Sequence, residues 1–114
     1  MAKVLIVDDN PEVRKTMRMY FESEGFEVSV AATVEQAAEM LEKRELDIVI
    51  TDFRLVDLTD NSGLAVYKAA EKREVPSILM AASRRDVPED VRFVAKARSA
   101  DFLEEVYKLL GEED

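Results

Sequence analysis

The stretch that most constrains the fold is an apolar run ending in two adjacent acids, KVLIVDDNPE at residues 3–12. Residues 4–7 are uninterrupted and apolar, which is typical of a strand buried on both faces of a parallel sheet. The Asn-Pro pair that follows predicts a helix start, because Asn caps helices and Pro fits the first helical position. Asp8 and Asp9 are therefore expected where a strand stops and a helix begins. Open α/β sheets bind their ligands at that edge.

A second apolar run, DIVITD at residues 47–52, also ends in an acid, Asp52. If the first and third strands are neighbours in a parallel sheet, Asp52 lies beside Asp8 and Asp9. Three carboxylates there repel each other unless a hard cation such as Mg²⁺ lies between them, and one is then free to act as a nucleophile. A later run, RFVAK, ends in Lys96, whose ammonium is suited to compensate the charge of a transferred phosphoryl group.

Composition narrows the class of function. The chain has 114 residues and a net charge of −9, which predicts one domain without the basic face that nucleic-acid binding needs. Its longest apolar run falls far short of the ~18 residues of a membrane span, and acids arrive too early for a signal peptide. Without cysteine or histidine, the chain has no disulfides, thiol chemistry or imidazole base, and a cytoplasmic location is expected.

Strand and helix patterns alternate with short connections, which predicts a doubly wound α/β sheet. The expected strands cover residues 4–7, 27–30, 47–52, 77–81 and about 92–95. The expected helices cover residues 11–24, 33–43, 63–73 and 99–110.

The last crossover is too short for this pattern. Fourteen residues, 82–95, separate Ala81 from Lys96, and some of them must form the fifth strand. The roughly ten that remain are at or below the minimum for a parallel crossover with its helix, so a full helix is not expected. Segment 82–91 and the neighbouring last helix are therefore predicted to bind a partner or a second copy of the chain. Besides the inward face of the last helix, the apolar side chains expected to be partly uncovered are Ile78, Met80 and Phe93.

Four segments, in this order, resemble the receiver domains of two-component response regulators: KVLIVDD, DIVITD, SGL at residues 62–64 and FVAK at residues 93–96. The resemblance covers nearly the whole chain. It implies a flavodoxin-like five-stranded parallel sheet of strand order 2-1-3-4-5, here with a shortened fourth crossover. It also implies Mg²⁺- or Mn²⁺-dependent transfer of a phosphoryl group from a kinase phosphohistidine to one aspartate.

Residue by residue, the resemblance makes Asp52 the phosphoacceptor. Asp9 matches the direct metal ligand, and Asp8 matches the acid that acts largely through metal-bound water. Asp52 itself and the backbone carbonyl of Arg54 complete the implied ligand set. Lys96 matches the lysine that contacts a phosphoryl oxygen.

The chain departs from the family pattern near the switch. Ala81 stands where the family has a hydroxyl residue at the end of the fourth strand, and Ser83 is the candidate substitute if its loop folds inward. Phe93 occupies the switch-aromatic position, and the fourth helix is expected to be largely missing. These departures leave the expected fold unchanged and bear on how a signal is transmitted.

The expected function is that of a stand-alone receiver over residues 1–114 with no output domain. It is expected to assist its own phosphorylation and dephosphorylation rather than act as an enzyme. Its expected partners are a sensor histidine kinase or phosphotransfer protein and an unknown downstream protein, with homodimerisation a further option; neither nucleic acid nor membrane is among them.

Three alternatives compete with this function. A degenerate receiver acting as a phosphorylation-independent interaction module is favoured by Ala81 and the short crossover. A metal-dependent phosphohydrolase would need an acid where Arg54 stands. A flavin-binding flavodoxin-like protein would need a phosphate loop where the acids of residues 8–9 stand.

Overall fold

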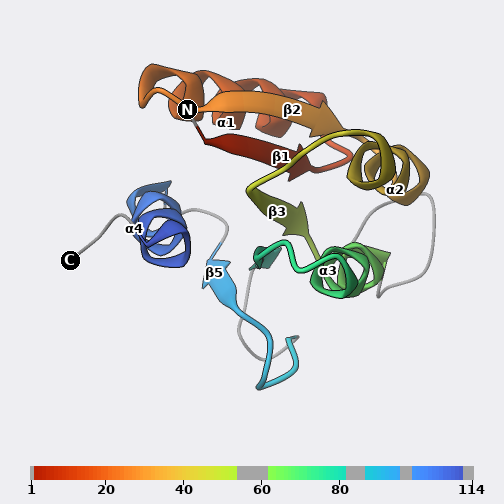
Figure 1. Cartoon of the computed structure of the whole chain (residues 1–114). Helices are drawn as coiled ribbons and strands as arrows, with labels where there is room; N and C mark the ends of the chain where they lie inside the picture. The colour runs from red at the N-terminus through yellow and green to blue at the C-terminus, as the bar shows by residue number, and fades with distance from the viewer. Residues whose placement is uncertain (1, 54–61, 82–86, 96–98, 112–114) are drawn as a thin grey trace.

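The computed structural model describes residues 2–53, 62–81, 87–95 and 99–111, and Figure 1 shows the path of the chain. The strands are β1 (Lys3–Val7), β2 (Glu27–Ala31), β3 (Ile48–Asp52), β4 (Ser77–Ala81) and β5 (Phe93–Ala95). The helices are α1 (Pro11–Ser23), α2 (Val34–Lys43), α3 (Ser62–Lys72) and α4 (Ser99–Leu110). Every strand and helix expected from the sequence is present, with only small shifts at the ends.

The five strands form one parallel sheet in the order β2-β1-β3-β4-β5, as predicted. Val7, the last residue of β1, lies opposite Ala31 of β2 and Thr51 of β3. The strand order reverses at β1, because α1 leads outward to β2 and α2 leads back to β3 on the other side. The carboxyl ends of β1 and β3 therefore flank the switch point, where open sheets bind ligands.

Both faces of the sheet are apolar and covered by helices, which is why its central strands show no polar alternation (Figure 1). The face covered by α1 and α4 buries Val4, Ile6, Phe21, Ile48, Ile50, Ile78, Met80 and Val106. The face covered by α2 and α3 buries Leu5, Val7, Leu41, Val49, Val66 and Ala70. Each of the larger of these side chains contributes roughly 1.5–3 kcal/mol by leaving water. No helix in the described ranges combines the length and apolar character needed to cross a membrane.

Side-chain caps fix the turns after β1 and β2. Oδ1 of Asn10 accepts a hydrogen bond from the Glu12 N–H (2.9 Å) at the start of α1. At the start of α2, Oγ1 of Thr33 accepts from the Gln36 N–H (3.1 Å), while the Gln36 side chain accepts from the N–H of residue 32 (2.7 Å). Such caps each stabilise a helix by about 1 kcal/mol and set where the preceding loop must end.

The crossover from β4 to β5 is described over residues 87–92, which contain no helix. Val87 and Val91 are nevertheless buried, and they belong to an apolar cluster with Tyr67 of α3 and Leu79 of β4. Two valines of an irregular segment thus cover part of the strip of sheet that a crossover helix would cover.

The prediction that Ile78 and Met80 are partly uncovered is wrong, because both are fully buried. Their side chains point to the face covered by α1 and α4, where Val106 of α4 is also fully buried. The short crossover affects the opposite face. Phe93, which pairs with Leu79 and shares that opposite face, is only partly buried, as predicted.

Candidate functional site

The three acids singled out in the sequence come together at one sheet edge. Asp8 follows β1 directly and Asp52 is the last residue of β3, and these strands are neighbours. Asp8, Asp9 and Asp52 each offer a carboxylate oxygen, and these oxygens all lie within 4.8 Å of one another. The predicted acidic cluster is therefore confirmed.

Burial makes it costly to hold these like charges together. Asp8 is fully buried, Asp52 is 7% exposed and Asp9 is half-buried. Two negative charges about 5 Å apart repel by about 3 kcal/mol at an effective dielectric constant of about 20. Three such charges in one buried corner favour a positive partner between them.

The turn that carries Asp8 and Asp9 is fixed by several hydrogen bonds. The N–H of Asp8 donates to the C=O of Ala31 (3.1 Å), and Oδ1 of Asp8 accepts from the Asn10 N–H (2.9 Å). Nη1 of Arg14, on α1, donates to the Asp8 carbonyl (2.8 Å). Sequence reasoning missed Arg14. The sequence feature that could have revealed Arg14 is its place near the start of a helix capped by Asn10. Side chains at such positions point back toward the preceding loop.

The end of β3 is packed tightly against the first turn of α3. The Gly63 N–H donates to the Phe53 carbonyl (2.9 Å). A Cβ at Gly63 would overlap the Asp52 carbonyl oxygen and lie 2.7 Å from the Phe53 Cα, so only glycine fits here. The sequence marked Gly63 as part of a family pattern, whereas the structure shows that it permits this close approach.

The donor set suits a hard divalent cation. Mg²⁺ and Mn²⁺ prefer carboxylate and carbonyl oxygens, and the three carboxylates provide ligands of that kind. Zinc sites usually contain nitrogen or sulfur ligands, and this chain has neither histidine nor cysteine.

The other predicted site residues divide into two groups. Ala81 ends β4 and is buried, and Phe93 begins β5, as the resemblance implied. Arg54, Ser83 and Lys96 lie outside the described residues, so their predicted roles stay predictions.

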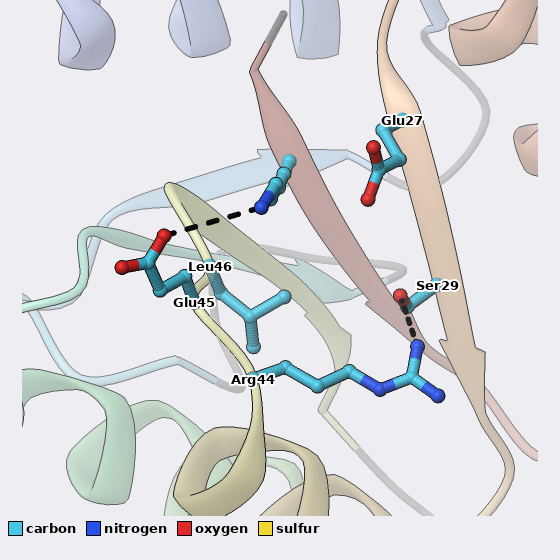
Figure 2. A pocket seen from close by; sticks show the side chains of 6 residues that line it. Glu27, Ser29, Arg44, Glu45 and Leu46 are labelled. Atoms are coloured by element: carbon cyan, nitrogen blue, oxygen red, sulfur yellow. Dashed lines mark hydrogen bonds and ion pairs between the residues drawn. The ribbon is translucent and has the colours of Figure 1, made fainter.

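A cavity of about 240 Å³ lies away from the acids, at the opposite end of the sheet. Figure 2 shows Glu27 and Ser29 from β2 beside Arg44, Glu45 and Leu46 from the segment after α2. Lys3 completes its lining, and Nζ of Lys3 lies 4.0 Å from Glu45, while Arg44 donates to Oγ of Ser29 (3.0 Å). The charged lining residues are two cations and two anions, so the cavity has no strong preference for ligand charge.

Comparison with known proteins identifies the family to which this sheet and acidic cluster belong. The family model described as the response regulator receiver domain matches residues 4–108. The TorCAD operon regulatory protein TorR of Escherichia coli K12 is 29% identical over 83 residues, or 73% of this chain and 35% of that protein. The regulatory protein VanR of Enterococcus faecium is 31% identical over 86 residues, or 75% of this chain and 36% of that protein. The chain thus spans about a third of the length of these relatives.

Among solved structures, the response regulator TrrA of Thermotoga maritima, in complex with Mg²⁺ and BeF, superposes with a TM-score of 0.83. It is 29% identical, and the match covers 96% of this chain and 100% of that one. The family model covers all of β2 to β5, β1 from its second residue and most of α4. The chain therefore belongs to the response regulator receiver domain family of two-component signalling.

Proposed function

We propose that this receiver accepts a phosphoryl group on Asp52 in a reaction that requires Mg²⁺ or Mn²⁺. The observation that carries the proposal is the grouping of three carboxylates, with oxygens within 4.8 Å of one another, at the switch edge of the sheet. The TrrA structure adds support, because it contains Mg²⁺ and a beryllium fluoride group, which mimics a phosphoryl group, in a domain of the same fold.

Asp52 is the proposed nucleophile because it ends β3 between the turn of Asp8 and Asp9 and the end of β4. One of its carboxylate oxygens attacks the phosphorus of a phosphohistidine, and the P–N bond breaks. The leaving imidazole nitrogen keeps the electron pair and is then protonated. Asp8, Asp9 and Asp52, with the carbonyl of Arg54, are the proposed ligands of the cation, which when bound neutralises charge on the phosphoryl oxygens. Lys96 is proposed to contact one of those oxygens.

The proposed phosphoryl donor is a sensor histidine kinase or a phosphotransfer protein in the cytoplasm, and the proposed output is contact with a downstream protein. In this scheme the domain is the kinase's substrate rather than an enzyme. The net charge of −9 argues against direct contact of this domain with nucleic acid.

A second candidate function is that of an interaction module that works without phosphorylation. Ala81 favours it, because a buried methyl group at the end of β4 provides no hydroxyl to contact a phosphoryl group. The grouped carboxylates favour the first function, since an interaction module gains nothing from buried like charges that destabilise its fold.

Intact-mass measurement after incubation with acetyl phosphate decides between the two functions. The expected result is a gain of one phosphoryl group with Mg²⁺ and none with EDTA. Asp52→Asn should abolish the gain, while Asp90→Asn, a substitution at an exposed aspartate outside the acidic cluster, should leave it intact. No mass gain in the wild-type domain at saturating Mg²⁺ would favour the phosphorylation-independent module.

A further inference from the structure

An apolar cluster connects the acceptor strand to the β4–β5 crossover. We call it the connector cluster, and its buried members are Phe53, Tyr67, Leu79, Ala81, Val87 and Val91. Phe53 directly follows the proposed acceptor Asp52, and Val87 and Val91 belong to the crossover. Side chains of one buried apolar cluster therefore connect the two regions.

Within this cluster, Tyr67 contributes a polar contact to the crossover backbone. The residue is 3% exposed, and its hydroxyl oxygen accepts a hydrogen bond from the Arg92 N–H (3.0 Å). The Arg92 carbonyl in turn accepts from the Leu79 N–H of β4 (2.8 Å), and Nη1 of Arg92 donates to the Ser77 carbonyl (3.4 Å). Arg92 is thus held between α3 and β4 at the point where the three-residue strand β5 begins.

The same helix begins at the acceptor site. Gly63 lies four residues before Tyr67, on the same face of α3 and about 6 Å along its axis. Its N–H donates to the Phe53 carbonyl (2.9 Å), and it has no room for a Cβ beside the Asp52 carbonyl. Successive turns of one rigid element therefore contact the acceptor strand and the crossover.

We infer that Tyr67 is a positioning residue that couples the state of Asp52 to the β4–β5 crossover through its hydrogen bond to the Arg92 N–H. This inference rests on the proposed function, since it requires a phosphoryl group or its mimic at Asp52. In a chain whose β4 ends in Ala81, the tyrosine hydroxyl of α3 provides a polar contact to the crossover that the methyl side chain of Ala81 cannot provide. Because coupling is reciprocal, the same bond influences how strongly the site holds its ligand.

Residue-resolved amide hydrogen exchange, with and without Mg²⁺ and fluoroberyllate, tests this inference. Fluoroberyllate binding at Asp52 is expected to change exchange at the Arg92 amide by roughly fivefold or more, the lower range of typical coupling between sites. Tyr67→Phe should still bind fluoroberyllate but lose this ligand-linked change at Arg92. By reciprocity, its fluoroberyllate affinity should change by a similar factor. Tyr20→Phe, at a partly buried tyrosine of α1 that contacts Phe21 edge to face, is the matched control and should behave as wild type.

The outcomes separate this inference from the proposed function. If the wild-type domain binds no fluoroberyllate, the proposed function fails and the coupling fails with it. If fluoroberyllate binds but Arg92 does not respond, or if Tyr67→Phe responds as wild type does, only the coupling is wrong. If Tyr67 had only a structural role, Tyr67→Phe would lower the unfolding midpoint and leave the ligand-linked change at Arg92 intact.

A second pair of variants addresses the same bond from its donor side. Arg92→Pro removes the N–H, whereas Arg92→Ala keeps the N–H and removes only the side chain; exchange at the neighbouring Phe93 amide reports the response in both. Proline is tolerated at the entrance to an edge strand such as β5. Arg92→Pro is expected to lose the ligand-linked change and Arg92→Ala to keep it, even if Tyr67→Phe does not fold. Equal responses from the two variants would overturn the inference.

Discussion

Gly63→Ala is the substitution whose effect the structure predicts most sharply. The added methyl group would overlap the Asp52 carbonyl oxygen and lie 2.7 Å from both the Asp52 carbonyl carbon and the Phe53 Cα. Ordinary contact begins near 3.4 Å, and all three atoms belong to backbone that cannot rotate away. The first turn of α3 and the end of β3 must therefore separate.

Two losses add up when these elements separate. The hydrogen bond from the Gly63 N–H to the Phe53 carbonyl is strained or lost, which costs about 1 kcal/mol. Overpacking of a well-packed interior costs roughly 1–3 kcal/mol more. We expect Gly63→Ala to lower the free energy of unfolding by about 3 kcal/mol, the sum of these two effects, and to weaken Mg²⁺ binding, because Asp52 moves with its backbone.

Urea denaturation, with Gly25→Ala as the matched control, measures this effect. Gly25 has a φ of +94° but nothing within 4 Å of the position that a methyl group would take, so alanine there should lose only roughly 1–2 kcal/mol from backbone strain. Gly63→Ala should thus be the more damaging change and the one that weakens Mg²⁺ binding. A Gly63→Ala domain that is as stable as wild type, or that binds Mg²⁺ as tightly, would refute the close approach.

Three further predictions concern the metal, the phosphorylated state and the backbone. Mg²⁺ at a hundred times its dissociation constant should stabilise the domain by about 2.7 kcal/mol. Asp9→Asn should weaken Mg²⁺ binding while raising stability in EDTA. A melting temperature that does not change with Mg²⁺ would show that the domain binds no such cation. Ala81→Thr should lengthen the lifetime of phospho-Asp52, because a charge-assisted hydrogen bond is worth about 1.5–3 kcal/mol, and an unchanged or shorter lifetime would show that the hydroxyl gains no contact. Glu74, just after α3, has a φ of +62°, which costs a residue with a Cβ roughly 1–2 kcal/mol, while glycine loses roughly 0.5–1 kcal/mol in chain entropy. Glu74→Gly should therefore raise the free energy of unfolding by about 0.5–1 kcal/mol in urea denaturation, and an unchanged or lower value would contradict the strain.

The sheet and the acidic cluster could be predicted because each depends on a strong local pattern. Residues 4–7 and 48–50 are apolar at every position, and only strands covered on both faces tolerate that. Once two such strands lie side by side in parallel, the acids at their carboxyl ends must meet. Caps at Asn10 and Thr33 fixed the starts of the first two helices in the same local way.

What the sequence could not supply depends on contacts between distant segments. The short crossover was correctly predicted to lack a full helix in its described part, but two of the side chains expected to be uncovered, Ile78 and Met80, lie on the other face. Periodicity gives the alternation of Ile78 and Met80 but not which helix covers them. Val87 and Val91 follow no strand or helix pattern, so the sequence did not predict their burial in one cluster with Tyr67. It also did not predict the hydrogen bond from the Arg92 N–H to the Tyr67 hydroxyl.

The central claim is that Asp52 carries the phosphoryl group, and chemical trapping tests it most directly. Borohydride reduces an aspartyl phosphate to homoserine, which peptide mass spectrometry locates in the chain. After treatment with acetyl phosphate and Mg²⁺, the peptide from Glu45 to Arg54 should contain homoserine at position 52, with Asp47 in the same peptide unchanged as an internal control. Homoserine at position 8 or 9, or at no position, would contradict the assignment.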